Sequence, residues 1–218
     1  MEIIKTWDKV PSLSELKEIH PEFKAILFDM DGTLLNTEPI HASSLRTALI
    51  NLTGNENIRS SEELDEMFRG QHDPMVFAKC INQKILTNMT TLTAFLSAKS
   101  KVVIEKSRKH LDTIFSDEIN SLLQEVLKDQ LGLGLVTNSE SDVTLDLLQR
   151  LEIIHLFNPL ICRGDCQYPK PDKQPYQTAC QFLKLNPKEV IVFEDSDSGL
   201  RSALSAETLV HKANWFKA

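Results

Sequence analysis

Two aspartates separated by one residue, Asp29 and Asp31, follow a short apolar run and stand directly before Gly32. The apolar run at residues 26–28 is typical of a strand buried in a parallel sheet. Residues two apart on an extended strand point the same way, so both carboxylates are expected at one site beyond the strand's carboxyl end. Two close carboxylates repel each other, and such a pair needs a cation, a shared proton or a separate role for each member.

A carboxylate pair of this kind is suited to two kinds of chemistry. Carboxylate oxygens bind hard cations such as Mg2+, and an aspartate can act as a nucleophile that forms an aspartyl-phosphate. The same residues also fit a strand end followed by an Asp-Gly turn with solvated carboxylates. The other polar clusters of the chain have to decide between these interpretations.

Further polar clusters follow two other predicted strands, at residues 131–137 and 190–193, and a lysine stands in the loop before the second of them. In a parallel sheet the carboxyl ends of all strands lie at one edge, so these groups can converge. Phosphoryl transfer needs such a set, because it depends on positioning and on charge neutralisation. Mg2+ would also screen the carboxylates from one another and from a phosphate. The complete set is Asp29, Asp31, Thr137, Asn138, Ser139, Lys170, Glu194 and Asp195.

The elements that must position this set alternate between strand and helix. Strands are predicted at 26–28, 131–137, 157–162, 190–193 and 208–210, and helices at 119–127, 143–151, 175–185 and 200–205. This alternation predicts an α/β fold, a Rossmann-like doubly wound parallel sheet.

A helical block interrupts the alternation after the first strand. Residues 40–115 carry almost only helical patterns, and Ser61 is expected to cap the second of these helices. We therefore expect an α/β core at 24–39 and 116–218, an inserted helical domain at 40–115, and an N-terminal extension at 1–23. A short helix with a serine cap is predicted within that extension, at residues 11–20.

Composition excludes some classes of function. The chain has 218 residues, a net charge of -7 and a pI of about 5.4, and no basic stripe of the kind that binds nucleic acid. Cys162 and Cys166 are spaced like half of a metal site, but no second Cys/His pair follows, which favours ordinary thiols. With no signal peptide or membrane-length apolar run in the sequence, we expect a cytoplasmic protein.

Four segments of the chain resemble the ordered motifs of the haloacid dehalogenase (HAD) superfamily. They are residues 29–33, 137–139, 170–171 and 193–199. The helical insert is similar to that family's C1 cap, and the subgroup that the chain resembles is the β-phosphoglucomutase and phosphoglycolate phosphatase-like hydrolases. The resemblance covers residues 24 to 210 and strengthens the interpretation of the two aspartates as a phosphoryl-transfer pair.

The resemblance implies three catalytic residues. Asp29 would be the nucleophile that forms the aspartyl-phosphate, and also a ligand of Mg2+. Asp31 would act as general acid on the leaving group and then as base for the attacking water, with its main chain touching the metal. Lys170 would hold the phosphate and the nucleophile together.

The resemblance also implies phosphate and metal contacts. Thr137 and Asn138 would bind the transferring phosphoryl group. Asp195 would be a ligand of Mg2+, and Glu194 would assist directly or through a water molecule. The presence of Asp31 argues against dehalogenation, since that branch of the family generally lacks an acid at this position.

Two residues of the helical block are candidates for contacts with the rest of the substrate. His41 lies on the first predicted helix of the block, where an ordinary helix-face histidine is the alternative. Arg69 stands at a helix break together with Gln71 and His72, where a solvated turn is the alternative.

The function expected from these residues is that of a Mg2+-dependent phosphatase acting on a small phosphorylated metabolite, such as a sugar phosphate or a similar monoester. The expected partner is this small-molecule phosphate ester, with no nucleic acid and no membrane, and a monomer is favoured. One alternative is a phosphomutase of the β-phosphoglucomutase kind, and another is a binding or regulatory protein on the same fold.

The chain departs from the family pattern near its C-terminal end. Residues 203–208 lack the Ala-Gly pair that closes the preceding helix in relatives, where a glycine supplies a left-handed cap. We therefore expect a different helix end at this point. Trp215 and Phe216 follow soon afterwards, which predicts a short last strand.

Overall fold

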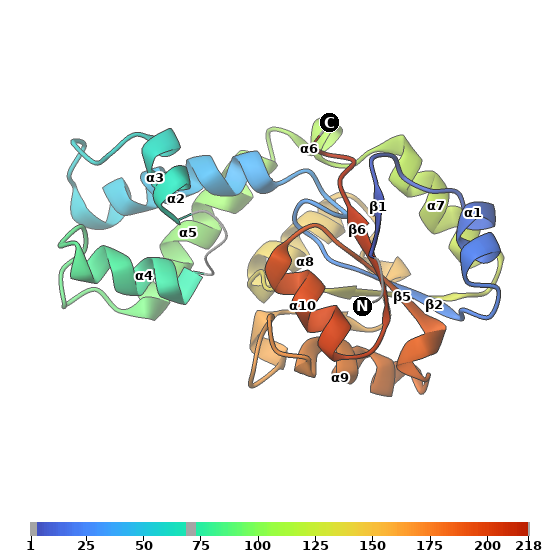
Figure 1. The fold of residues 1–218 in the computed structure, drawn as a ribbon. Helices are drawn as coiled ribbons and strands as arrows, with labels where there is room; N and C mark the ends of the chain where they lie inside the picture. The colour runs from blue at the N-terminus through green and yellow to red at the C-terminus, as the bar shows by residue number, and fades with distance from the viewer. Residues whose placement is uncertain (1–3, 69–72, 218) are drawn as a thin grey trace. The chain divides into compact units, whose positions relative to one another are not determined.

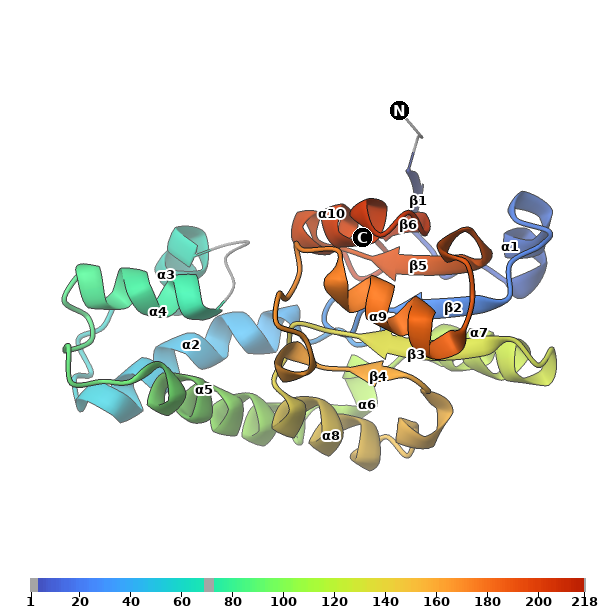
Figure 2. The ribbon, with the colours of Figure 1, turned by 90° about the horizontal axis from the view of Figure 1, so that it is seen from below.

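The protein is described by a computed structural model that covers residues 4–68 and 73–217. The chain separates into two compact units, one made of residues 1–36 and 112–218 and the other of residues 37–111. Figures 1 and 2 together label the helices and strands of both units.

The first unit contains a six-stranded sheet in which every pair of neighbours is parallel. The chain runs from β2 to β3 and β4 on one side of the sheet and then to β5 and β6 on the other. The direction of winding therefore reverses between β2 and β5, which confirms a doubly wound sheet and places its switch point there. In sheet order the strands are β1 (Lys5–Trp7), β6 (Leu209–Ala213), β5 (Val190–Glu194), β2 (Ala25–Phe28), β3 (Gly132–Val136) and β4 (Leu160–Ile161).

Helices cover both faces of this sheet because right-handed crossovers in opposite directions lie on opposite faces. On one face, α9 (Gln174–Leu183) and α10 (Asp197–Ser205) lie side by side (Figures 1 and 2). On the other, α7 (Asp117–Lys128) packs against β3 and beside α1 (Leu13–Ile19). The core under α9 and α10 consists of Ala25, Leu27, Val136, Ile161, Tyr176, Ala179, Cys180, Val190, Val192, Ala203 and Ala206.

The N-terminal segment contributes both of its elements to the first unit. The predicted helix is α1, and its cap is Ser12, whose Oγ accepts a hydrogen bond from the Glu15 backbone N–H at 3.3 Å. The strand β1 was not predicted, and it pairs with β6 with Lys5 opposite His211. Trp7 anchors this edge, because its buried indole Nε1 donates to His211 Nδ1 at 3.0 Å.

The second unit is helical, as the pattern of residues 40–115 predicted, and α2 packs against α3 and α5. Its helices are α2 (Glu38–Thr53), α3 (Ser61–Phe68), α4 (Asp73–Asn82) and α5 (Leu92–Ser107). The cap predicted for α3 is wrong by one residue, since Ser60 and not Ser61 accepts the Glu63 backbone N–H, at 3.2 Å. The core of this unit consists of Leu45, Leu49, Leu64, Phe68, Val76, Cys80, Leu86 and Phe95.

Two expectations for the C-terminal part of the chain are wrong: an unusual end of helix α10 and a short last strand. Glu207 takes the left-handed conformation, with φ of 64°, that a glycine would have supplied after α10, so the helix ends in the usual way. The strand β6 is five residues long, because its pairing with both β5 and β1 extends it to Ala213. The remaining elements are α6 (Leu111–Ile114), α8 (Ser141–Arg150) and three 3-10 turns at Ile154–Leu156, Arg163–Asp165 and Pro187–Glu189.

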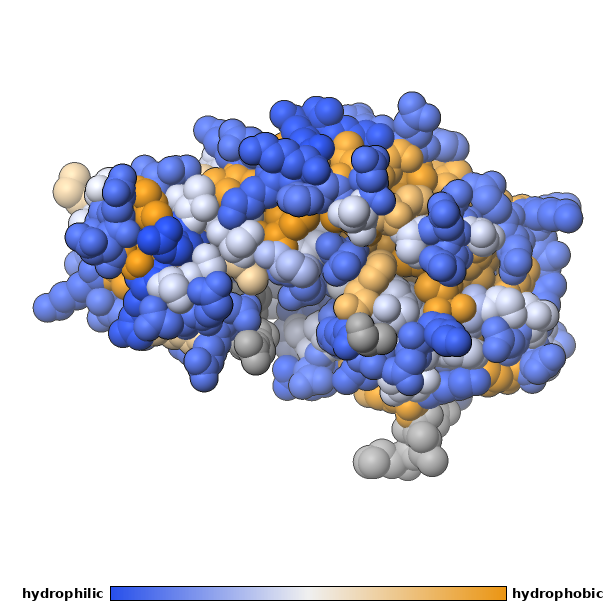
Figure 3. Space-filling view, turned by 90° about the horizontal axis from the view of Figure 1, so that it is seen from above, coloured by the Kyte–Doolittle hydropathy of each residue, from blue (hydrophilic) through white to orange (hydrophobic). Residues whose placement is uncertain are grey.

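The surface of the molecule has the mixed character that its composition predicts. Hydrophilic residues make up most of the face drawn in Figure 3, and hydrophobic residues show between them. Within residues 4–68 and 73–217, no helix combines the length and the apolar character that crossing a membrane requires.

Candidate active site

The register between β2 and β5 brings two carboxylates to the switch point. The Asp29 backbone N–H donates to the Phe193 carbonyl at 3.0 Å, which continues the ladder beyond β2. Side chains alternate along a strand, so Asp29 points to the same face as Leu27, and Glu194 to the same face as Val192. That is the face that α9 and α10 cover. The two carboxylates therefore meet at the carboxyl ends of their strands, where the sequence predicted convergence, and they lie on the face that these helices cover.

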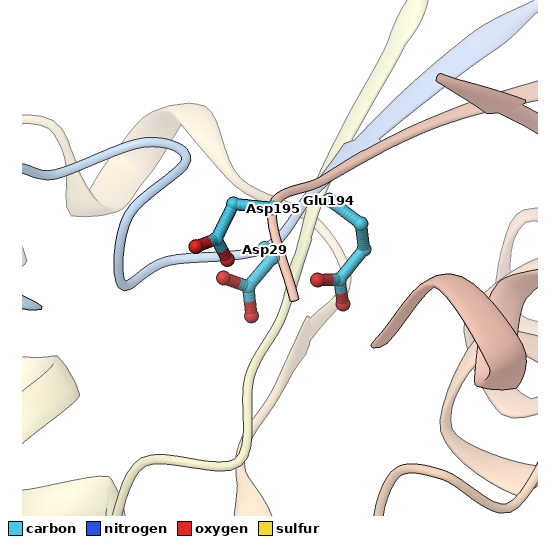
Figure 4. A group of neighbouring side chains, drawn as sticks. All are labelled: Asp29, Glu194 and Asp195. Carbon is cyan, nitrogen blue, oxygen red and sulfur yellow. The ribbon is translucent and has the colours of Figure 1, made fainter. Parts of the chain in front are cut away.

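Asp29, Glu194 and Asp195 form a cluster of three buried carboxylates (Figure 4). Each offers one oxygen that lies within 4.8 Å of the oxygens offered by the other two. Burial raises the pKa of Asp29 well above its usual range, and the neighbouring charge of Glu194 adds to this effect. Burial also raises the pKa of Asp195. Three hard oxygen ligands that oppose one another's ionisation fit a divalent cation such as Mg2+.

Lys170 joins the cluster from the loop before α9. Its Nζ donates to Asp29 Oδ1 at 2.7 Å, to Glu194 Oε1 at 2.6 Å and to the Val136 carbonyl at 2.6 Å. Burial alone would lower the pKa of this lysine, but the charges of Asp29 and Glu194 outweigh it and leave the pKa raised. Lys170 is therefore a fixed cation beside the carboxylate predicted to be the nucleophile.

Tyr176 is part of this network, and the sequence analysis did not identify it. It lies on α9, is fully buried, and donates its hydroxyl proton to Glu194 Oε1 at 2.6 Å. Burial and the Glu194 charge raise the pKa of Tyr176 well above its usual range, which keeps the hydroxyl a donor. In the sequence it is only one residue of the helix predicted at 175–185, and its position six residues after Lys170 carries no recognisable signal.

Two glycines make room for the carboxylates. A Cβ added at Gly199 would lie 1.9 Å from the Glu194 carboxylate, so only a glycine permits Glu194 to rest on the first turn of α10. A Cβ added at Gly32 would lie 2.6 Å from Asp195 Oδ2, and the φ of 79° at Gly32 also favours glycine. Both glycines stand within the motif segments at 29–33 and 193–199.

The loop after β3 ties the site together. Asn138 Nδ2 donates to the Lys170 carbonyl at 3.0 Å, and Asn138 Oδ1 accepts the Lys170 backbone N–H at 3.1 Å. Ser139 Oγ donates to Asp31 Oδ2 at 2.5 Å, and the buried Thr137 Oγ1 accepts the Ser139 backbone N–H at 3.0 Å. This loop thus holds both the backbone of the lysine and the second aspartate of the first motif.

The two substrate-contact candidates, His41 and Arg69, belong to the helical block. His41 lies in the first turn of α2, where its backbone N–H donates to the Thr37 carbonyl at 3.0 Å. Arg69 lies outside the described residues, as do Gln71 and His72. Substrate contact by His41 and Arg69 stays a prediction.

The family of the chain follows from comparison with known proteins. The model of haloacid dehalogenase-like hydrolases matches residues 26–212. A phosphorylated carbohydrates phosphatase of Thermotoga maritima is 28% identical over 201 residues, which are 89% of this chain and 89% of that protein. Fructose-1-phosphate phosphatase YqaB of Escherichia coli is 24% identical over 86% of this chain and 95% of its own length. The chain belongs to the haloacid dehalogenase-like hydrolase family and is an enzyme of its phosphatase type.

Solved structures agree with this assignment at the level of the fold. CbbY of Rhodobacter sphaeroides, in a complex with phosphate, superposes with a TM-score of 0.77 at 22% identity over 87% of this chain and 85% of that one. A β-phosphoglucomutase-like protein of Thermotoga maritima has a TM-score of 0.65 at 25% identity over 86% of this chain and 84% of that one.

Proposed function

We propose that this protein is a Mg2+-dependent phosphatase that hydrolyses a small phosphorylated metabolite, a sugar phosphate or a similar monoester, through an aspartyl-phosphate intermediate. The observation that carries the proposal is the Asp29 carboxylate, which is bound to Lys170 inside a buried cluster with Glu194 and Asp195. A carboxylate in this position is oriented, desolvated and paired with a cation, as a nucleophile toward phosphorus must be.

The metal would be held by the side chains of Asp29, Asp195 and Glu194 and by the main chain of Asp31. When bound, Mg2+ would neutralise charge on the phosphate and on the carboxylates. Its positive charge would also favour the ionised form of Asp29, against the burial that raises its pKa.

In the first step an Asp29 oxygen attacks the phosphorus atom, and the ester P–O bond to the leaving group breaks. Asp31 donates a proton to the leaving oxygen, so the alcohol departs neutral. Thr137 and Asn138 bind the transferring phosphoryl group, and Lys170 balances its charge while holding Asp29 in line.

In the second step a water molecule attacks the phosphorus of the aspartyl-phosphate. Asp31, now ionised, accepts a proton from that water, and the bond between phosphorus and the Asp29 oxygen breaks. Inorganic phosphate is released and both aspartates return to their starting protonation states. The hydrogen bond from Ser139 supports this role by orienting the Asp31 carboxylate.

The names of the relatives support a sugar phosphate as the substrate class. One acts on phosphorylated carbohydrates, one on fructose 1-phosphate and a third on validoxylamine A 7'-phosphate. Other relatives are named pyrophosphatases, so pyrophosphate belongs in any substrate panel.

The test is phosphate release from sugar phosphates, nucleotides, phosphoglycolate, pyrophosphate and an aryl phosphate, with and without Mg2+. We expect Mg2+-dependent release by the wild type and none by Asp29→Asn, which preserves size but removes the nucleophile. Asp129→Asn is the matched control, because Asp129 is the exposed residue that follows α7 and its carboxylate forms an ion pair with Lys17. Release that survives Asp29→Asn, or silence on every ester, would overturn the proposal.

A phosphomutase is the second candidate, favoured by the 25% identity to the β-phosphoglucomutase-like protein of Thermotoga maritima. The same aspartyl-phosphate would then pass its phosphoryl group to a sugar hydroxyl instead of water. Incubation with β-glucose 1-phosphate and a bisphosphate primer tests this candidate. Glucose 6-phosphate formed faster than inorganic phosphate would establish the mutase, and its absence would remove it.

A further inference from the structure

The segment that follows β6, residues 214–217, reaches the two loops that carry the carboxylates. Trp215 Nε1 donates to the Thr33 carbonyl at 2.9 Å, which fixes the segment to the loop after Asp31. The Trp215 ring also meets Phe193 of β5 edge to face, with 5.4 Å between ring centroids. Two independent contacts thus anchor this segment beside the candidate metal cluster.

Lys217 follows this anchor and forms an ion pair with one carboxylate of the cluster. Its Nζ lies 2.9 Å from Asp195 Oδ2 and 3.3 Å from the Asp195 carbonyl. The carboxylate is buried, whereas 46% of the lysine side chain is exposed. Asp195 therefore has a partner that can leave toward solvent, unlike Lys170, whose side chain is enclosed.

We propose that Lys217 is an internal cation that competes with the divalent metal ion for Asp195 and sets the metal affinity of the site. The inference rests on the proposed function, since it takes Asp195 as a metal ligand. A metal ion at Asp195 meets a like charge at Oδ2, so binding must displace the ammonium group or tolerate its repulsion. The segment at 214–217 thereby raises the concentration of free metal at which the site fills.

The charges of the cluster support this assignment. Asp29, Glu194 and Asp195 bring three carboxylates together, and Lys170 offsets one of them from a fixed position. Lys217 offsets a second one only while it stays on Asp195. Because it is half-exposed and screened by solvent, removing its charge should tighten metal binding by about three- to tenfold.

The experiment measures Mn2+ binding by the electron paramagnetic resonance signal of the free ion, which requires no substrate and no turnover. Lys217→Met keeps the length of the side chain and removes the charge, and Lys217→Arg keeps the charge. Lys188→Met is the matched control, because this exposed residue lies next to the start of β5, far along the strand from its carboxyl end. Asp195→Asn identifies the site that is being titrated.

We expect Lys217→Met to bind Mn2+ about three- to tenfold more tightly than the wild type. Lys217→Arg and Lys188→Met should stay within about twofold of the wild type, since neither alters the charge beside Asp195. Trp215→Ala, which releases the anchor, should change the affinity in the same direction as Lys217→Met. An unchanged affinity in Trp215→Ala would overturn the anchoring role of Trp215.

Two results separate failure of this inference from failure of the proposed function. Wild-type protein that binds Mn2+ through Asp195, with equal or weaker binding by Lys217→Met, would overturn the inference alone. Weaker binding would mean that Lys217 orients the carboxylate for the metal. Wild-type protein whose Mn2+ binding is the same as that of Asp195→Asn would overturn both.

Discussion

The hydroxyl of Tyr176 offers a single-atom test of the site's architecture. Tyr176→Phe removes only the oxygen that donates to Glu194 Oε1 at 2.6 Å, and the ring keeps its place in the core under α9. A hydrogen bond to a charged group contributes roughly 1.5–3 kcal/mol to stability. Because Glu194 Oε1 keeps the bond from Lys170, we expect a loss of about 2 kcal/mol, in the lower half of that range.

The loss can be measured as a change in the unfolding free energy and in Tm. For a chain of this size about 2 kcal/mol corresponds to a fall in Tm of roughly 4–8 °C. Circular dichroism during urea and thermal unfolding, with a chelator present, gives both quantities without a contribution from bound metal. Tyr168→Phe is the matched control: Tyr168 is 55% exposed and its hydroxyl accepts a hydrogen bond from the neighbouring Gln167, so we expect a change within about 0.5 kcal/mol.

The same variant should weaken metal binding, because Glu194 Oε1 loses one of its two donors. Residues that hold a metal ligand in place typically change metal affinity by about tenfold or more when they are removed. Mn2+ binding by Tyr176→Phe should therefore weaken by about tenfold while Tyr168→Phe binds as the wild type does. If Tyr176→Phe matched Tyr168→Phe in both stability and metal affinity, the hydroxyl would not secure Glu194, and the reasoning from this contact would fail.

Three further changes test other features of the fold. Glu207→Gly should raise Tm by about 2–4 °C in thermal unfolding, because glycine relieves about 1 kcal/mol of left-handed strain at φ of 64°. Asp29→Asn should be more stable than the wild type in chelator at pH 7.5, because burial raises the pKa of Asp29 and the wild type therefore loses stability as pH rises above the pKa of this residue in the unfolded chain. In urea titrations below about pH 4 this stability difference between variant and wild type should vanish, because Asp29 is then protonated in both the folded and the unfolded wild type. Burial lowers the pKa of His211 to about 4, whereas the histidine of the unfolded chain keeps its ordinary pKa of about 6.5. The unfolded chain therefore takes up a proton first, and the unfolding free energy should fall by about 3 kcal/mol as pH drops from 6.5 to 4. The measurement is the unfolding free energy from urea titrations at each pH. A free energy that does not change between pH 6.5 and 4, or a fall that persists in His211→Gln, would contradict this prediction.

The central strands could be predicted because each is a continuous apolar run. All residues of β2 and β5 are buried, and their sequences contain no polar residue until the strand ends. The edge strand β1 has only three residues, of which Trp7 alone is buried, and its partner β6 lies at the other end of the chain. Nothing local distinguishes such a strand from a loop, since the pairing itself makes it a strand.

The carboxylates of the site could be predicted for a related reason. Asp29 and Glu194 stand where apolar strands end, and a parallel sheet brings those ends to one edge. The partners that hold them could not be predicted, because Tyr176 reaches Glu194 from a helix packed across the sheet face. Which residue of a helix faces a buried carboxylate depends on the packing of that helix, and one sequence does not show it.

The buried carboxylates also connect two of these measurements. Asp29, Glu194 and Asp195 lie together at a cost to stability, because burial and mutual repulsion raise the pKa values of Asp29 and Asp195. Asp29→Asn relieves that cost without metal, and a divalent cation relieves it in the wild type. Saturating Mg2+ should therefore stabilise the wild type more than Asp29→Asn, by at least the advantage that the variant holds in chelator. If Mg2+ stabilised both proteins equally, the metal would bind elsewhere, and these three carboxylates would not be its binding site.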